Sequence, residues 1–349
     1  KSVRTPHMDR LAREGVNFTR ARSPVPLTLP AHASILTGNY PPTHTVRSNG
    51  EYILPEHQLS LAEVLVENGY RTSAFVASFV LDRRFGIGQG FEHYDDRVWS
   101  EIEEIENTEA ERSADEVFVA FSEWLTDADD EVPRFTWIHL YDPHAPYEPP
   151  EPFRTEYSSD PYAGEVAYTD HIVGRILAAL EDSGDLETTL VAVVGDHGEG
   201  LGEHGERTHS LLIYNSTLHV PMILWSPGLV PEGHRVYDLV RVIDLAPTIL
   251  SLLGFQHELG EGVSLRPLFE ESELPGEANG LTAYSESLYP ELALGWSPLR
   301  ALEDADHRLI LAPTAELYRI SSDPRETENR AAEETSTYQP VSYTHLTLP

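Results

Sequence analysis

The chain has 349 residues, no cysteine and a formal net charge of −34. These numbers exclude a disulfide framework and a thiolate metal site, and they argue against nucleic-acid binding, which needs a basic surface. No apolar run approaches the roughly 20 residues of a membrane span, and the length allows one or two α/β domains with a large core.

Helical and strand patterns alternate along the first 255 residues, which is typical of a mostly parallel sheet flanked by helices. Helices are predicted at residues 59–68, 110–125, 168–180 and 239–253. Strands are predicted at residues 72–77, 134–140, 189–194 and 221–225. The acidic segment 97–112 is expected to be an exposed loop or the start of a helix. After Gly254 the pattern weakens into short strands at residues 282–286, 299–302, 308–312 and 315–320.

A proline-led run follows a hydroxyl side chain early in the chain. Thr28 precedes Pro30 by two residues, and residues 31–37 are compatible with a helix. Proline suits the first turn of a helix, where its missing N–H costs nothing. Thr28 is therefore expected at or just before a helix N-terminus, where free N–H groups favour an anion. It is either a helix cap or a nucleophile at an anion site.

A wholly apolar run, residues 191–194, ends in Asp196 and His197 with a glycine on each side. A buried parallel strand delivers ligands in this way to the carboxyl end of a sheet. A carboxylate with a neutral imidazole fits a divalent cation and leaves calcium, magnesium, manganese and zinc open. The alternative is a satisfied polar pair at a strand end. Together with Thr28, the pair indicates metal-assisted attack on a phosphate or sulfate ester.

Several segments match, in order, the signatures of a known family. Thr28-Leu29-Pro30-Ala31-His32 stands where that family has Cys/Ser-x-Pro-x-Arg, and Leu36-Thr37-Gly38 follows. The other matching segments are residues 5–16, 142–147, 244–250 and 316–324. The chain thus resembles the sulfatases of the alkaline phosphatase superfamily.

The resemblance implies an alkaline-phosphatase-like three-layer α/β sandwich with a mostly parallel central sheet. Residues 1–255 would form the catalytic domain, and residues 256–340 a small C-terminal α+β subdomain. The family normally opens with a buried strand that carries metal-binding aspartates. No such strand precedes residues 5–16, so we expect a fragment of a longer protein, impaired in metal binding and turnover. We interpret residues 341–349 as translated sequencing adapter; the alternative is a genuine polar tail.

The resemblance also implies roles for single residues. Thr28 would be the nucleophile and a metal ligand, together with the ligands Asp196 and His197. His144 would contact the ester or its leaving group; the alternative is a histidine that packs its loop. His209 stands where sulfatases place a lysine that holds the substrate oxyanion.

Two further positions belong to the substrate site that the resemblance implies. His32 replaces the signature arginine, which orients the nucleophile. Asn49 stands at the spacing at which related phosphonate and sulfate ester hydrolases place a substrate-binding asparagine; the alternative is a turn residue.

Departures from the family pattern shape the expected reaction. Formylglycine is made from cysteine or serine, so Thr28 must attack as a plain alkoxide. Residues 77–80 lack two cationic sulfate contacts of the family. We therefore favour a metal-dependent hydrolase or transferase of phosphate mono- or diesters. The alternatives are an arylsulfatase-like sulfuric ester hydrolase and a catalytically silent member that binds anions.

The expected substrate is a small-molecule, glycan or lipid ester with an anionic group. The signal region is not visible, so the localisation is open, with a periplasmic or membrane-anchored position favoured.

Overall fold

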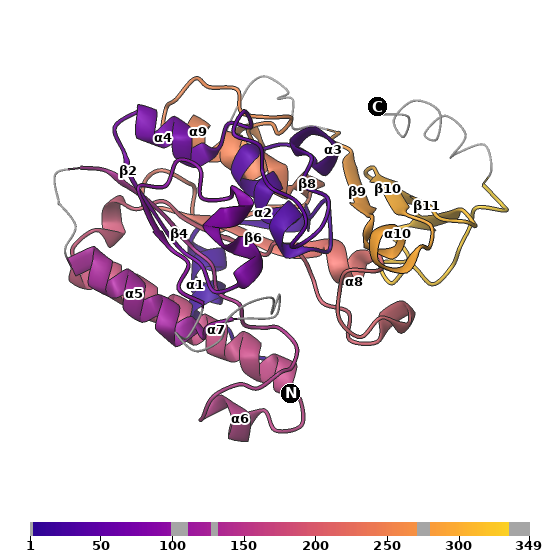
Figure 1. Cartoon of the computed structure of the whole chain (residues 1–349), viewed down its shortest axis with the longest axis horizontal. Coiled ribbons are helices and arrows are strands. Elements are labelled where there is room, and N and C mark those ends of the chain that lie inside the picture. Colours follow the sequence, from indigo (N-terminus) through magenta and orange to yellow (C-terminus); the bar gives the residue numbers. More distant parts are fainter. Residues whose placement is uncertain (1–2, 99–110, 127–131, 271–279, 335–349) are drawn as a thin grey trace. The chain divides into compact units, whose positions relative to one another are not determined.

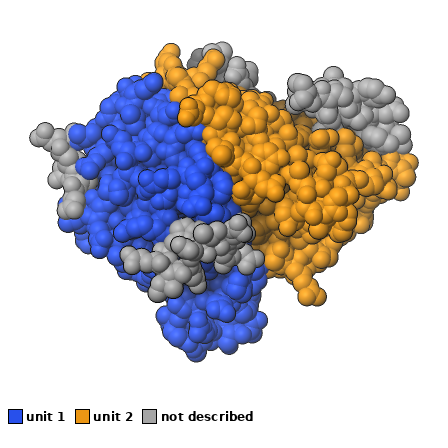
Figure 2. Space-filling view, viewed as in Figure 1, with its two compact units in different colours: residues 1–16, 60–192, 223–234 blue, residues 17–59, 193–222, 235–349 orange. Residues whose placement is uncertain are grey.

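The computed structural model describes residues 3–98, 111–126, 132–270 and 280–334. Most of the acidic segment 97–112 and all of residues 341–349 lie outside these ranges. The chain forms two compact units (Figure 2). Unit 1 comprises residues 1–16, 60–192 and 223–234, and unit 2 comprises residues 17–59, 193–222 and 235–349. Because each unit is assembled from separate segments, the predicted boundary at residue 255 is not tested and stays a prediction.

Unit 1 contains a three-stranded parallel sheet in the order β3-β2-β4. Its strands are β2 (Arg71–Phe75), β3 (His93–Asp95) and β4 (Arg134–Ile138). Ser73 of β2 lies opposite His93 on one side and Thr136 on the other. The parallel pairing predicted from the alternating pattern is confirmed here.

Five helices belong to unit 1: α1 (Pro6–Glu14), α4 (Leu61–Glu67), α5 (Ala114–Thr126), α6 (Phe153–Glu156) and α7 (Pro161–Asp182). Helices α5 and α7 lie side by side (Figure 1). The apolar face of α5 buries Val117, Phe121 and Trp124 together with Phe75 of β2. A Ser60–Glu63 capping box begins α4. Periodicity thus predicted α4, α5 and the second part of α7, whereas α1 and α6 were not predicted from it.

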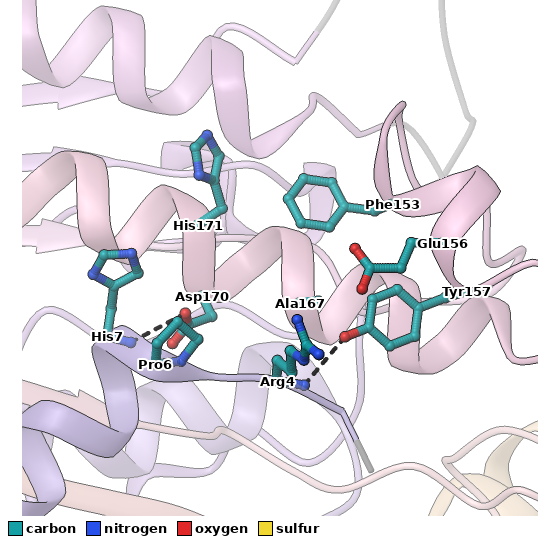
Figure 3. Close-up of a pocket in the computed structure, with 9 residues that line it drawn as sticks. All are labelled: Arg4, Pro6, His7, Phe153, Glu156, Tyr157, Ala167, Asp170 and His171. Carbon is teal, nitrogen blue, oxygen red and sulfur yellow. Dashed lines mark hydrogen bonds between the residues drawn. The ribbon is translucent and has the colours of Figure 1, made fainter. Parts of the chain in front are cut away.

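A carboxylate of α7 fixes the start of α1 (Figure 3). Asp170 is 1% exposed and accepts hydrogen bonds from the backbone N–H groups of His7, at 3.2 Å, and Met8, at 2.8 Å. Unpaired N–H groups at a helix N-terminus are commonly satisfied by such an acceptor. The adjoining cavity of about 190 Å³ contains none of the predicted site residues.

A second sheet has the strand order β5-β6-β1-β7, and β8 pairs in parallel with β1. Its strands are β1 (Val16–Arg22), β5 (Val191–Val194), β6 (His219–Trp225), β7 (His234–Val236) and β8 (Val240–Arg241). Strand β1 was not predicted. Its polar residues Arg20 and Arg22 hide the strand pattern, and both bind Glu303, whose side chain is 2% exposed.

The C-terminal part of unit 2 is a four-stranded antiparallel sheet in the order β12-β11-β10-β9 (Figure 1). The strands are β9 (Ala283–Ser287), β10 (Leu299–Glu303), β11 (His307–Leu311) and β12 (Glu316–Arg319). Each overlaps a predicted short strand. Glu303 also binds Arg308, whose Nη1 donates to Glu326 Oε1 at 2.8 Å. These buried charges neutralise one another and join β1 to the antiparallel sheet.

The remaining helices of unit 2 are α2 (Thr28–Thr37), α3 (Pro41–His44), α8 (Asn215–Leu218), α9 (Leu245–Leu252) and α10 (Tyr289–Leu294). The predicted helix at residues 239–253 is wrong in its first part. Residues 240 and 241 form β8, and a 3₁₀ helix, Val242–Asp244, precedes α9. The reason is local: Asp244 accepts from Arg241 N at 2.9 Å, which delays the α-helix.

Short 3₁₀ helices complete the described part of the chain, at Phe79–Leu81, Arg83–Phe85, Leu186–Thr188, Glu203–Gly205 and Arg266–Leu268. None of the described helices combines the length and the apolar composition that crossing a membrane requires.

Candidate active site

The first residue of α2 is Thr28, as the proline-led run predicted. Leu27, in extended conformation, is the cap residue, so the Thr28 hydroxyl does not act as the helix cap. Thr28 Oγ1 instead lies 3.3 Å from Nε2 of His197. The residue is only 6% exposed. The cap interpretation is therefore wrong, and the hydroxyl faces a side chain from the second motif.

Two predicted substrate residues hold the start of α2. The Leu29 N–H donates to Asn49 Oδ1 at 2.9 Å, so Asn49 satisfies one free N–H of the helix. His32 lies one turn further along the helix, with Nδ1 2.9 Å from the carbonyl oxygen of Thr28. The same Nδ1 is 3.6 Å from Asp196 Oδ2. His32 thus connects the first motif to the second, and both residues contact the neighbourhood of Thr28.

The turn after β5 presents Asp196 and His197. The His197 N–H donates to Asp196 Oδ1 at 2.9 Å, and His197 Nε2 is 3.4 Å from Asp196 Oδ2. His197 Nδ1 lies 2.9 Å from the carbonyl oxygen of Gly198. Because a carbonyl only accepts, Nδ1 carries the proton and Nε2 offers its lone pair. Burial lowers the pKa of His197, which keeps the imidazole neutral.

Glycines let this turn lie against the segment that leads into β6. A Cβ on Gly198 would lie 2.2 Å from the carbonyl oxygen of Ser216, which no real contact allows. The Gly198 N–H donates to Thr217 O at 2.8 Å, and the Gly195 N–H donates to Pro221 O at 3.0 Å. Close backbone packing therefore requires a glycine at position 198, whereas a Cβ on Gly195 would lie 3.1 Å from a side-chain atom, Pro221 Cδ.

His209 joins the same group of side chains. Its ring centroid is 4.3 Å from that of His197, and its Nδ1 is 3.4 Å from Glu199 Oε2. The other oxygen, Glu199 Oε1, is buried and has no hydrogen-bond partner among the residues that the structure describes. Glu199 was not predicted from the sequence, although its position two residues after His197 was a signal. A buried unpaired carboxylate oxygen in such a group calls for a donor or a cation.

These residues fit one part of a divalent cation's ligand set. Thr28 Oγ1 and Asp196 Oδ2 lie 3.3 and 3.4 Å from His197 Nε2, so each of these two oxygens lies near the same imidazole nitrogen. The mixture of carboxylate, neutral imidazole and hydroxyl suits a hard or borderline ion. Within the described ranges no group of three or more histidine, cysteine, aspartate or glutamate side chains could hold a metal. Asp196 and His197 supply only two ligands, so a cation would also need the Thr28 hydroxyl or further oxygen ligands.

His144 belongs to unit 1, in the loop between β4 and α6. Its N–H donates to Glu165 Oε2 at 2.9 Å, its Nδ1 lies 2.7 Å from Ala145 O, and its Nε2 lies 3.2 Å from Tyr141 Oη. Glu165 also accepts from Glu148 N at 2.6 Å. The structure therefore brings the other predicted residues together in unit 2 and shows how the His144 loop is held, while the role of His144 stays a prediction.

The chain is similar to known families and proteins. A family model described as Sulfatase matches residues 1–255. A second, described as N-sulphoglucosamine sulphohydrolase, C-terminal, matches residues 202–344. The chain is 27% identical over 337 residues to an ulvan-active sulfatase of Formosa agariphila, covering 80% of the chain and 63% of that protein. It is 22% identical over 356 residues to an arylsulfatase of Clostridium perfringens, covering 77% and 74%.

Solved structures share the fold. A protein in complex with its substrate D-glucosamine-2-N,6-O-disulfate matches with a TM-score of 0.78 and 20% identity, over 98% of this chain and 91% of the other. A phosphonate monoester hydrolase of Agrobacterium radiobacter matches with a TM-score of 0.78 and 22% identity, over 98% and 89%. At this identity the likeness concerns the fold and not the substrate.

Proposed function

This chain belongs to the sulfatase family, and we propose that it hydrolyses phosphate esters through Thr28 as the nucleophile. Its fold is the α/β fold of the alkaline phosphatase superfamily, and the family consists of ester hydrolases that generally use a divalent metal. The observation that carries the proposal is the position of Thr28. Its hydroxyl stands at the first residue of a ten-residue helix, 3.3 Å from the lone-pair nitrogen of His197.

The surrounding residues have separate tasks in this proposal. Thr28 Oγ1 attacks phosphorus, and the N-terminus of α2 favours the negative charge that gathers there. Asp196, His197 and Thr28 would hold the cation. When bound, a divalent metal polarises the ester and lowers the pKa of a coordinated hydroxyl. Asn49 and His32 keep the first turn of α2 in place, as their contacts with Leu29 N and Thr28 O indicate.

Two histidines complete the proposed mechanism. His209 lies beside His197, which supports a role for it in holding an ester oxygen. His144 would donate a proton to the departing alcohol. Thr28 gives up its hydroxyl proton to solvent, its Oγ1 bonds to phosphorus, and the bond from phosphorus to the alcohol breaks as the alcohol takes a proton from His144. Water then attacks the phosphorus of the phosphothreonine, which releases phosphate and returns a proton to Thr28 Oγ1. Threonine supports this route because it can attack without prior modification.

A sulfate ester is the second candidate, because the relatives named above are called sulfatases. The names of the ulvan-active sulfatase and of the protein bound to a glucosamine disulfate favour a sulfated sugar. Thr28 argues against it. A sulfothreonine lacks the second hydroxyl with which formylglycine expels sulfate, so its release would be slow.

The test is a substrate panel assayed with added manganese, calcium or zinc. It contains phosphate monoesters, phosphate diesters and aryl sulfates, and it compares the protein with Thr28→Ala and Thr28→Ser. We expect a phosphate ester to be preferred, Thr28→Ala to lose about 10³-fold or more in kcat/KM, and Thr28→Ser to keep much of it. Preference for aryl sulfate, with Thr28→Ala nearly as active as the parent, would remove the proposal. Binding of phosphate without turnover of any ester would identify a silent member.

A further inference from the structure

The backbone directly after His209 has a strained conformation. Ser210 has a φ of 97°, in the left-handed region that favours glycine and that residues with a side chain rarely adopt. A residue such as serine stays in this region only where the surrounding structure fixes it. The contacts of the peptide group between Ser210 and Leu211 therefore decide how the segment leaves His209.

Two buried side chains fix this peptide group, one at its carbonyl and one at its N–H. Ser287, the last residue of β9, donates from its hydroxyl to Ser210 O at 2.5 Å. Glu206 accepts from Leu211 N at 2.8 Å and also from Leu212 N at 3.0 Å. Ser287 is 1% exposed and Glu206 is 6% exposed, so water competes little with either contact.

The two contacts connect the peptide group to different parts of unit 2. Glu206 lies only three residues before His209, in a stretch that is mostly exposed to solvent, so it holds the loop to itself. Ser287 instead belongs to the antiparallel sheet, where it pairs with Leu299 of β10. The hydroxyl of Ser287 thus ties the segment after His209 to a regular element that is distant in the sequence.

The ring of His209 depends on the backbone that carries it. Its Nδ1 lies 3.4 Å from Glu199 Oε2, which is long for a hydrogen bond and therefore weak. Its centroid lies 4.3 Å from that of His197, at an interplanar angle of 36°. Contacts of this kind accept small displacements, so a shift of the backbone at Ser210 would move the ring.

We propose that Ser287 is a positioning residue for His209, because its hydroxyl holds Ser210 in the left-handed conformation that keeps the His209 ring beside His197. Its effect on the reaction rests on the proposed function, in which His209 holds an ester oxygen. Ser287 acts only through the backbone of Ser210. Its loss should displace His209 and should remove no contact to the ester.

A double-mutant cycle with the preferred phosphate ester tests this assignment. Ser287→Ala should lower kcat/KM about tenfold, because a small displacement of a group in the site is costly. In the His209→Ala background the same substitution should cost less than about twofold, since the side chain that Ser287 positions is gone. Ser287→Thr keeps the hydroxyl and should retain most of the activity. Equal losses from Ser287→Ala in both backgrounds would overturn the assignment.

Ser285→Ala is the matched control. Ser285 lies two residues before Ser287 in β9, is 4% exposed and donates from its hydroxyl to Ser23 O at 3.1 Å. Each substitution therefore removes one hydrogen bond from a buried serine of the same strand to a carbonyl oxygen of a distant segment. Ser285→Ala should change kcat/KM by less than about twofold. A loss as large as that of Ser287→Ala would assign the effect to β9 in general and would overturn the inference.

Histidine ring signals separate failure of this inference from failure of the proposed function, because they need no turnover. In protein labelled with ¹³C-histidine and held at one pH, the ring signal of His209 is the one that His209→Ala removes. This signal should shift in Ser287→Ala and stay in place in Ser285→Ala, even if no phosphate ester is hydrolysed. An unchanged His209 signal in Ser287→Ala would overturn the inference, whatever the substrate.

Discussion

Two loops carry the candidate histidines, one with His144 and one with His197 and His209. A buried carboxylate holds the backbone of each, but the side chains of the two loops contact different segments. In unit 1, Glu165 accepts two backbone N–H groups of the His144 loop. In unit 2, Glu206 accepts two N–H groups just after His209. Both carboxylates are buried, and burial raises the pKa of each, for Glu165 to about 7.

The two loops differ in the segments that their side chains contact. Glu165 belongs to α7, outside its loop, and the ring of His144 contacts Tyr141 and Ala145 of the loop itself. In the second loop, which runs from the turn after β5 to His209, two side chains contact α2. His197 Nε2 lies beside the Thr28 hydroxyl, and the Asp196 carboxylate lies beside His32. A buried carboxylate therefore fixes a backbone in either case. In the function proposed above, the second loop differs because it contacts a distant segment, α2, which carries the proposed nucleophile Thr28.

The largest effect is expected from a substitution at Asp196, in the second loop. Asp196→Asn should lower kcat/KM by about 10³-fold or more and weaken divalent-metal binding by at least about 100-fold, because it removes a charged ligand and leaves the backbone turn in place. Activity and calorimetric titration with manganese measure both effects. Asp306→Asn, a similar change in the exposed turn between β10 and β11, is the control and should alter neither. Unchanged metal affinity in Asp196→Asn would show that Asp196 is not a ligand.

The next largest effect concerns the two glycines of the turn after β5, where the backbone packs closely against the segment before β6. Gly198→Ala should lower the free energy of unfolding by about 3 kcal/mol, because the new Cβ would collide with the Ser216 carbonyl at 2.2 Å. Gly195→Ala in the same turn should cost about 1 kcal/mol, since its Cβ would be 3.1 Å from a side-chain atom, Pro221 Cδ. Urea unfolding distinguishes the two. Equal costs would contradict the account of the turn.

The last expected effect concerns the His144 loop of unit 1 and depends on pH. Glu165 has a folded-state pKa of about 7, raised by burial from its ordinary value of 4.5. The folded protein thus holds this proton more tightly, and the stability present below pH 4.5 is lost as the pH rises to about 7. Glu165→Gln cannot ionise. The unfolding free energy of the parent should fall relative to this variant by about 3 kcal/mol across that range, whereas parallel pH curves would contradict the shift.

Local patterns in the sequence predicted much of the fold. The apolar run before Asp196 is β5, the proline-led run is α2, and the amphipathic periodicity at residues 110–125 corresponds to α5 within the described residues. Strand β1 was not predicted, because charged residues such as Arg20 and Arg22 are typical of an exposed segment. Their partner, Glu303, is far away in the sequence, so only the folded chain shows that these charges are neutralised.

The candidate site was likewise predicted only in part from the sequence. Thr28, Asp196 and His197 could be predicted because each stands at the end of a regular element with proline or glycine beside it. The contacts that organise them could not, since His32 meets Asp196, and Glu199 meets His209, only after the segments pack. Glu165 and Glu206 gave no sequence signal, because their role is to accept N–H groups whose positions depend on the fold.

The most direct test of the central claim is whether Thr28 carries the transferred group. The protein is mixed with its preferred phosphate ester in the presence of the activating metal and quenched in acid, and the peptide that contains Thr28 is examined by mass spectrometry. The account predicts one phosphoryl group on Thr28, the same group on serine in Thr28→Ser, and none in Thr28→Ala, which is also inactive. Turnover of the ester with Thr28 unmodified, at a rate that Thr28→Ala retains, would contradict it.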